Sequence, residues 1–239
     1  MRLCVGSHLC NYNDMTGNTN KIIENISSKT DKCILFFSCG KDSIVCLDYI
    51  YPKFNTIHCV FMYFVKDLEH INRWIRWAKV RYPKIIFYQC PHFALTHLMR
   101  KGIYCTPNPK IKQLSLSDIV RAMRAKFNCE YVFTGMKKAD SMTRRVMLMT
   151  YEKNNYENKG MVYPLAEWTN KEILAYMKQR GLPEPVRYSK KSGGGVGFEP
   201  ETFIWLRDNF PQDLEKIYAA FPFSRRILFE YDNQIDNDE

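Results

Sequence analysis

Short apolar runs alternate with amphipathic stretches along most of the chain. The run Cys33–Phe37 is followed by a turn that contains Gly40, which is typical of a buried strand. Further apolar runs predict strands at Thr56–Phe64, Lys84–Gln89, Tyr131–Thr134 and Met161–Tyr163.

Helical spacing fills the intervals between these strands. Leu68, Ile71, Ile75 and Ala78 recur every three or four residues, which indicates one apolar helix face. Helices are predicted at Thr19–Ser28, Ser43–Tyr51, 67–82, 93–101, Ser117–Phe127, 169–180, 200–209 and 211–220. The acidic residues after 232 are expected to fray.

The alternation of strands and helices from 33 to 180 sets the fold class. It predicts an α/β fold with a doubly wound, five-stranded parallel sheet, Rossmann-like, and a small C-terminal helical extension. We therefore expect an N-terminal polar, helical extension at 1–30, an α/β domain at 31–185, and a C-terminal Gly-rich loop with helices at 186–239.

Composition indicates which class of protein and which cellular compartment to expect. Hydrophobic residues make up 46% of the 239 residues, enough for a sizeable core, yet no apolar run is long enough to span a membrane. Polar residues follow Met1 at once, so no secretory segment is expected. Nine cysteines occur without a CxxC pair, which predicts neither zinc nor an iron–sulfur cluster and favours the cytoplasm.

The formal net charge of +10 favours an anionic partner, either a nucleotide or nucleic acid. A chain this rich in Asn and Lys would suit a phage or another A·T-rich genome, so action in a host cytoplasm is one expectation.

The segment Ser38-Cys39-Gly40-Lys41-Asp42-Ser43 lies between the first strand and the first helix. Ligands of open α/β sheets bind beyond the carboxyl ends of strands, where helix N-termini offer unpaired N–H groups to anions. Gly40 lets the backbone approach an anion, and Lys41 adds a positive charge. Asp42 is expected either to cap the helix or to hold Mg²⁺ through water. The thiol of Cys39 could be acidified by the helix end, although we expect its backbone N–H to matter more.

This loop matches the S-x-G-x-D-S motif of the PP-loop, or adenine nucleotide alpha hydrolase, superfamily, whereas a Walker A sequence is absent. Three later segments resemble motifs of the phosphoadenosine phosphosulfate (PAPS) reductase family. They are Gly135–Arg145, the block from Tyr163 to Ile173 that begins Tyr-Pro-Leu, and Gly181–Pro185 with Tyr188. The resemblance covers roughly residues 30–190.

The resemblance implies roles for particular residues. Ser38, Cys39, Gly40, Lys41, Asp42 and Ser43 would hold the phosphates, Met62 and Tyr63 would contact adenine, and Gly135 would lie against the nucleotide. Lys137, Arg144 and Arg145 would meet a distal phosphate or sulfate. Lys41, Asp42, Arg144 and Arg145 are the candidate catalytic residues.

Departures from the family pattern matter equally. No cysteine follows Cys129, so the family's C-terminal catalytic cysteine motif is missing. Cys105 lies in a Tyr-Cys-Thr-Pro loop and is the candidate substitute nucleophile. The Gly-rich segment 192–197 could be a lid or a plain loop.

Three functions remain open on this sequence. The first is an enzyme that cleaves ATP, or a related adenine nucleotide, at the α-phosphate, adenylylates a second substrate and releases pyrophosphate. That substrate could be nucleic acid, a sulfur-metabolism compound or a sulfur-carrier protein. The second is a PAPS reductase that uses a non-standard thiol. The third is a non-catalytic adenine-nucleotide-binding sensor or subunit. The chain could also form a homodimer or belong to a modification complex.

Overall fold

The computed structural model describes residues 7–152, 155–185 and 197–238, with side chains for residues 17–233 within these ranges. The chain folds into two compact units. The first comprises Met1–Val60, Tyr82–Tyr88 and Met123–Pro185, and the second Phe61–Arg81, Gln89–Ala122 and Val186–Glu239. The units interleave along the chain, whereas the predicted division at 30 and 185 is sequential and stays a prediction.

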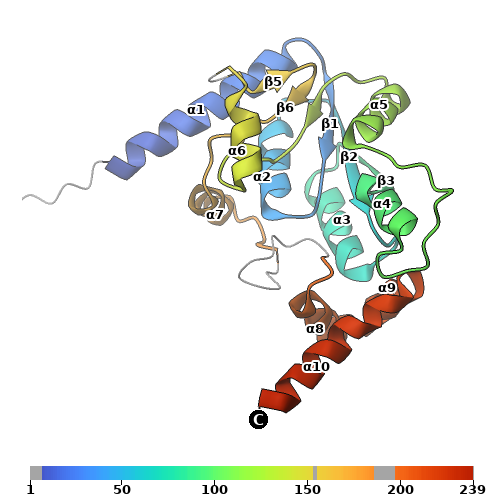
Figure 1. The fold of residues 1–239 in the computed structure, drawn as a ribbon. Helices are drawn as coiled ribbons and strands as arrows, with labels where there is room; N and C mark the ends of the chain where they lie inside the picture. The colour runs from blue at the N-terminus through green and yellow to red at the C-terminus, as the bar shows by residue number, and fades with distance from the viewer. Residues whose placement is uncertain (1–6, 153–154, 186–196, 239) are drawn as a thin grey trace, which may run out of the picture. The chain divides into compact units, whose positions relative to one another are not determined.

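The secondary structure alternates as expected (Figure 1). The strands are β1 (Lys32–Phe36), β2 (Thr56–Tyr63), β3 (Ile85–Pro91), β4 (Val132–Phe133), β5 (Glu157–Asn158) and β6 (Met161–Val162). The helices are α1 (Ser7–Ser27), α2 (Lys41–Ile50), α3 (Glu69–Arg81), α4 (Phe93–Lys101), α5 (Leu116–Phe127), α6 (Met142–Met149), α7 (Asn170–Gln179), α8 (Pro200–Asn209), α9 (Pro211–Ala220), the 3-10 turn η1 (Pro222–Arg225) and α10 (Arg226–Asp238).

The strands form one mostly parallel sheet in the order β3-β2-β1-β4-β6-β5. β1 pairs in parallel with β2 and β4, and β4 pairs in parallel with β6. The chain builds one side of the sheet outward from β1, then crosses to the other side at β4. This reversal confirms the doubly wound α/β class and places the topological switch point at the carboxyl end of β1.

Several elements differ from the sequence prediction. β5 is a sixth strand, antiparallel to β6, that two polar residues form without an apolar run. α1 begins at Ser7 rather than near Thr19. α10 continues to Asp238, where we expected fraying.

Buried strands and helices form the core of the first unit. Ile34, Leu35, Val132 and Phe133 have no exposed surface. The rings of Tyr49 on α2 and Tyr176 on α7 stack with centroids 4.6 Å apart. The buried Asp48 carboxylate accepts hydrogen bonds from the Tyr176 hydroxyl at 2.7 Å and the Arg180 guanidinium at 2.9 Å. These contacts fix α2, the helix that follows the predicted phosphate loop, against α7.

Polar contacts of Thr19, within α1, and at the start of α7 fix these two helices as well. The Trp168 indole donates to Thr19 of α1 at 2.9 Å, and the Thr19 hydroxyl donates to the Pro164 carbonyl at 2.8 Å. Thr169 and Glu172 form a reciprocal capping box at the start of α7. Thr169 is therefore the N-cap of α7, and α1 belongs to the core of its unit.

In the second unit, Asp213 at the start of α9 caps α3. Its carboxylate accepts from the backbone N–H groups of Glu69 at 2.8 Å and His70 at 2.9 Å, and contacts His70 Nδ1 at 2.8 Å. Burial lowers the pKa of His70 despite the opposing effect of Asp213. Leu95, Cys105 and Phe221 pack together in an apolar cluster of this unit.

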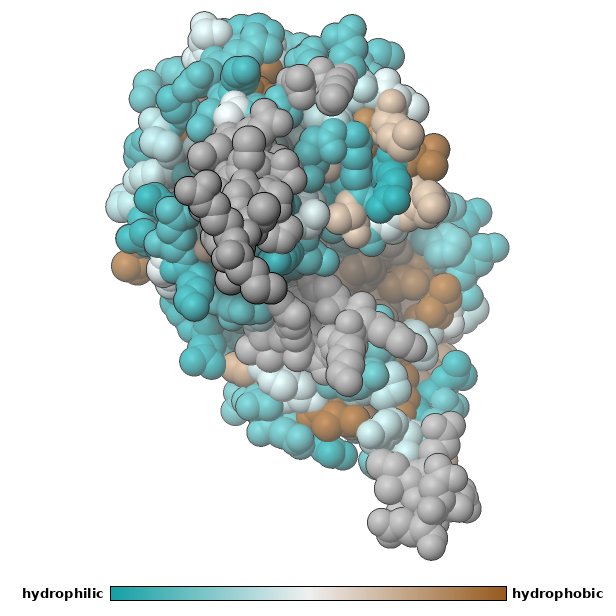
Figure 2. All heavy atoms as spheres, turned by 90° about the vertical axis from the view of Figure 1, so that its left-hand side faces the viewer, coloured by the Kyte–Doolittle hydropathy of each residue, from teal (hydrophilic) through white to brown (hydrophobic). Residues whose placement is uncertain are grey.

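The surface is largely polar. Figure 2 shows one face on which hydrophilic residues predominate and hydrophobic side chains occur in small groups. Among the described residues, no helix combines the length and the apolar character that crossing a bilayer requires.

Candidate functional site

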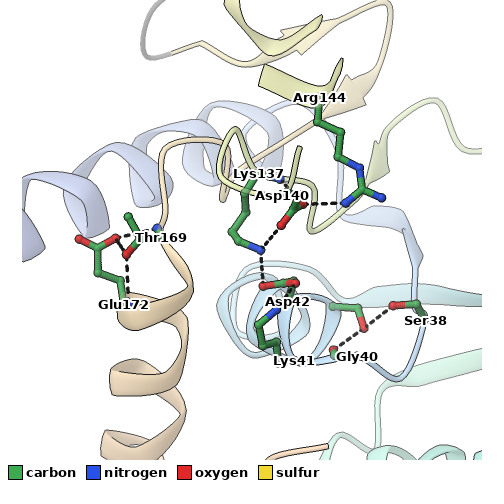
Figure 3. Close-up of polar contacts among 10 residues, drawn as sticks. Ser38, Gly40, Lys41, Asp42, Lys137, Asp140, Arg144, Thr169 and Glu172 are labelled. Atoms are coloured by element: carbon green, nitrogen blue, oxygen red, sulfur yellow. Dashed lines mark hydrogen bonds and ion pairs between the residues drawn. The ribbon is translucent and has the colours of Figure 1, made fainter. Parts of the chain in front are cut away.

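The predicted phosphate loop leaves the carboxyl end of β1 and leads into α2 (Figure 3). Cys39 adopts a left-handed backbone conformation with φ of 61°, a region that non-glycine residues enter at a cost. The N-cap of α2 is Gly40, not Asp42, and no side chain caps this end. The first N–H groups of α2 therefore have no partner within the helix and remain for an anion.

Internal hydroxyl contacts hold the loop in this shape. The Ser43 hydroxyl donates to the Gly40 carbonyl at 2.8 Å, and the Ser38 hydroxyl donates to Ser43 at 3.3 Å. Ser43 is almost completely buried. Ser43 thus shapes the loop from within as well as offering a hydroxyl to a ligand.

The segment after β4 lies directly against the start of α2. A Cβ atom placed on Gly135 would lie 2.8 Å from both the carbonyl carbon and the carbonyl oxygen of Asp42. Only glycine permits this approach without displacing backbone. Gly135 therefore joins two segments that are far apart in sequence, as its predicted place beside a nucleotide requires.

A chain of alternating charges connects the two segments (Figure 3). Asp42 Oδ2 lies 2.9 Å from Lys41 Nζ, and Asp42 Oδ1 lies 2.6 Å from Lys137 Nζ. The latter contact is an ion pair rather than an aligned hydrogen bond, because Oδ1 has no hydrogen-bond donor among the described residues. Lys137 Nζ also lies 2.6 Å from Asp140, whose other oxygen accepts from Arg144 at 2.8 Å.

Burial separates the roles of these cations. The Lys137 side chain has no exposed surface and lies between two carboxylates. By contrast, the Arg144 side chain is 46% exposed, although it pairs with Asp140. Arg145 is also exposed, and its Nε donates to the Lys138 carbonyl at a long 3.5 Å. The geometry makes Lys137 a support for Asp42, while Lys41, Arg144 and Arg145 are the cations that a phosphate could reach.

Asp140 belongs to this chain of charges, although it is not among the predicted site residues. It bridges Lys137 and Arg144, and its carboxylate accepts from the Lys137 backbone N–H at 3.0 Å. Burial alone would raise its pKa, but the Lys137 hydrogen bonds and the nearby charges lower the pKa below its usual range. Its spacing from Lys137 and Arg144, three residues and four, was the available signal.

The remaining predicted site residues belong to the second unit. Met62 and Tyr63 end β2, as expected, and both side chains are half-buried. Cys105 is buried in the cluster with Leu95 and Phe221, and this burial raises the pKa of its thiol. A raised pKa lowers the thiolate fraction, so the structure does not favour Cys105 as a nucleophile.

The thiol of Cys39 is not acidified by the adjacent helix end. Burial raises the pKa of Cys39 far above its usual value. The contribution of Cys39 to the loop is therefore its left-handed backbone, not a reactive sulfur.

A magnesium ion at Asp42 is not favoured by this arrangement. Both carboxylate oxygens already face ammonium groups, which a divalent cation would have to displace. Among the described residues no cluster of three acidic, histidine or cysteine side chains could hold a metal. Magnesium in sites of this kind is bound largely by substrate phosphates, so it would have to arrive with the nucleotide.

Comparison with solved structures identifies relatives of this fold. ATP-bound FMN adenylyltransferase from Candida glabrata is 16% identical, with a TM-score of 0.53 over 82% of this chain and 65% of that one. For the same enzyme with FAD and inorganic pyrophosphate, the identity is 14% and the TM-score is 0.52, over 82% of this chain and 67% of that one. A phosphate complex of PAPS reductase from Candida auris is 12% identical, with a TM-score of 0.47 over 77% of this chain and 90% of that one.

The TM-scores of 0.53 and 0.52 establish a fold shared with the adenylyltransferase, and this chain spans 65% of the length of its ATP-bound form. No curated protein matches by sequence. Residues 32–191, however, match the phosphoadenosine phosphosulfate reductase domain, and that match covers well over half of the chain. Together with the doubly wound sheet and the loop at its switch point, this match shows that the chain belongs to the phosphoadenosine phosphosulfate reductase family, within the PP-loop fold.

Proposed function

We propose that this protein binds ATP, or a closely related adenine nucleotide, at Ser38–Ser43 and cleaves it at the α-phosphate. The observation that carries the proposal is the loop itself. The left-handed backbone at Cys39 and the uncapped start of α2 leave backbone N–H groups available to an anion at the switch point, which supports the proposal. Lys41 stands at its edge, and Gly135 and the exposed Arg144 adjoin it.

The proposed reaction is adenylyl transfer. An oxygen of the second substrate attacks the α-phosphorus, the bond from that phosphorus to the bridging oxygen breaks, and pyrophosphate leaves. The substrate oxygen loses its proton to solvent. The N–H groups of α2 and the Lys41 ammonium stabilise the charge that develops on the phosphates, while Arg144 and Arg145 bind the departing end. Magnesium enters as part of the nucleotide substrate.

Cysteine chemistry favours this reaction over sulfonucleotide reduction. Reduction needs a thiolate, yet no cysteine follows Cys129. Cys105, the available substitute, is buried and its pKa is raised. The ATP and pyrophosphate complexes of FMN adenylyltransferase show that a protein of this fold binds both molecules.

The adenine contact, the acceptor of the adenylyl group, the cellular location and the oligomeric state are also part of the proposal. Met62 and Tyr63 would contact the adenine. The net charge of +10 leaves room for nucleic acid as the acceptor of the adenylyl group, with a sulfur-metabolism compound or a sulfur-carrier protein as the other candidates. The protein would act in the cytoplasm, alone, as a homodimer or as part of a modification complex.

The test compares nucleotides and variants in one design. Wild type, Lys41→Ala and Ser43→Ala are incubated with magnesium and labelled ATP or PAPS, and binding, pyrophosphate and sulfite are followed. Lys171→Ala is the matched control, because that lysine is exposed in the first turn of α7. We expect Lys41→Ala to weaken ATP binding about tenfold or more, as loss of a charge-assisted phosphate contact does.

Each outcome separates the candidate functions. Pyrophosphate release from ATP when nucleic acid or cell extract is added supports adenylyl transfer. Sulfite from PAPS and added thiol would assign the reductase instead. Binding without either product would leave a sensor, and failure of the folded wild type to bind either nucleotide would remove the proposal.

A further inference from the structure

A second basic site lies in the first unit at the amino ends of β1 and β4. A surface cavity of about 540 Å³ opens there, lined among others by Lys29, Lys32, Arg124, Cys129, Glu130 and Tyr131. The phosphate loop lies beyond the carboxyl end of β1, and the five residues of that strand span roughly 17 Å. The two sites therefore lie at opposite ends of the same strands.

The two lysines of this cavity, Lys29 and Lys32, form no ion pairs among the described residues, and Glu130 is the acidic residue among the described lining. Arg124 donates through Nη2 to the Lys159 carbonyl at 2.7 Å. Its Nε is buried and has no acceptor among the described residues. The cavity thus contains a buried donor and two ammonium groups without partners.

The C-terminal ends of two helices offset part of this positive charge. α1 ends at Ser27 and α5 at Phe127, and the residues that follow each helix line the cavity. A helix C-terminus carries about half a negative charge, so the two ends together offset about one cation. Glu130 offsets another. Of the three cations, about one positive charge remains for a ligand.

The electrostatic effects of these cations converge on the cavity wall. Burial raises the pKa of the Cys129 thiol, while the charges of Lys32 and Arg124 act in the opposite direction. Burial lowers the pKa of His58, and the Lys32 charge lowers it further. Lys32 and Arg124 therefore both act on Cys129, a residue that lines the cavity.

We propose that this cavity binds the phosphate group of a ligand other than the nucleotide at Ser38–Ser43. Lys29 and Lys32 contact the phosphate oxygens, and Arg124 adds its positive charge beside them. The phosphate belongs either to a free phosphate compound or to a nucleic-acid backbone, and the net charge of +10 suits both sources.

The experiment uses the full chain, isotopically labelled, with backbone amide signals followed by NMR. The probes are inorganic phosphate and, separately, a single-stranded RNA of about 20 nucleotides. The variant is Lys29→Gln/Lys32→Gln, and Lys171→Gln is the matched control. Arg124 is left unchanged because it supports the Lys159 carbonyl.

We expect either probe to shift the amides of residues 29–32 and 128–131, and the double variant to weaken that binding at least about fivefold. If RNA is the source, it binds at far lower concentration than phosphate. The slope of log affinity against log salt then becomes shallower by about 1.4 in the double variant. The control leaves both measurements unchanged.

Two results would overturn the proposal. The first is a folded wild type in which neither probe moves these amides, or in which only those of residues 38–43 move. The second is a double variant that binds as wild type does. Loss of ATP binding at the phosphate loop would not affect this result, so the proposed function and this site fail separately.

Discussion

The two ends of the sheet in the first unit carry positive charge in different ways. At the carboxyl ends, Lys41, Lys137 and Arg144 each contact a carboxylate. At the amino ends, Lys29 and Lys32 contact none among the described residues. The paired end also has a specialised backbone, with Cys39 left-handed and Gly135 against Asp42. The number of charges alone therefore does not describe a site. Ion pairs fix the positions of charged side chains, whereas an unpaired charge attracts a ligand of opposite charge.

Removing the buried cation should produce the largest effect. Lys137→Met leaves Asp140 and Asp42 without their shared partner, so we expect the free energy of unfolding to fall by about 3 kcal/mol or more. Lys32→Met, at the unpaired end, should change it by less than about 0.5 kcal/mol. Urea denaturation of both variants measures the difference. Equal losses would show that pairing does not distinguish the two ends.

Filling the close contact at Gly135 should have the next largest effect. Gly135→Ala forces a Cβ atom into the Asp42 backbone, and overpacking of this kind costs about 1–3 kcal/mol. ATP binding should weaken as well, because the start of α2 is displaced. Gly17→Ala is the control: nothing lies within 4 Å of its new Cβ, and α1 should gain up to about 1 kcal/mol. Unchanged ATP binding in Gly135→Ala would contradict the role of this glycine at the site.

The pH dependence that Asp140 contributes to stability should be the smallest of the three effects. The pKa of Asp140 is lower in the folded chain than its usual value. Its contribution to stability is therefore present above the unfolded pKa of about 3.9, and it is lost as the pH falls through the lower folded value. We expect unfolding curves measured between neutral pH and pH about 3 to show a shallower acid loss for Asp140→Asn than for wild type. Identical pH profiles for Asp140→Asn and wild type would show that Asp140 has no part in the charge chain.

Much of the fold could be predicted from local patterns. The apolar run at Cys33–Phe37 corresponds to β1. The motif that follows this run predicts a loop between a strand and a helix. β5 could not be predicted, because Glu157 and Asn158 form a strand only through pairing with β6. The start of α1 at Ser7 could not be predicted either, because the mostly polar residues between Ser7 and Asn18 show no regular apolar spacing.

The basic residues after β4 could be grouped from the sequence, but their different burial could not be predicted. Sequence grouped Lys137 with Arg144 and Arg145 as phosphate ligands, because all three are basic residues after one strand. Burial assigns Lys137 to Asp42 and Asp140 instead, and leaves Arg144 exposed. Side-chain burial depends on tertiary packing, which spacing along the chain does not encode. The placement of Met62, Tyr63 and Cys105 near a ligand stays a prediction, as does the role of Tyr188, which lies outside the described residues along with most of the Gly-rich segment.

The Asp213 cap has a practical meaning for anyone who shortens this chain. The family match ends at residue 191, so a fragment cut there would retain every motif of the resemblance. It would nevertheless lose the carboxylate that closes the N-terminus of α3, together with the Phe221 ring that covers Leu95 and Cys105. The helices after residue 197 are therefore part of the second unit's folding requirement, and a minimal fragment must extend past them.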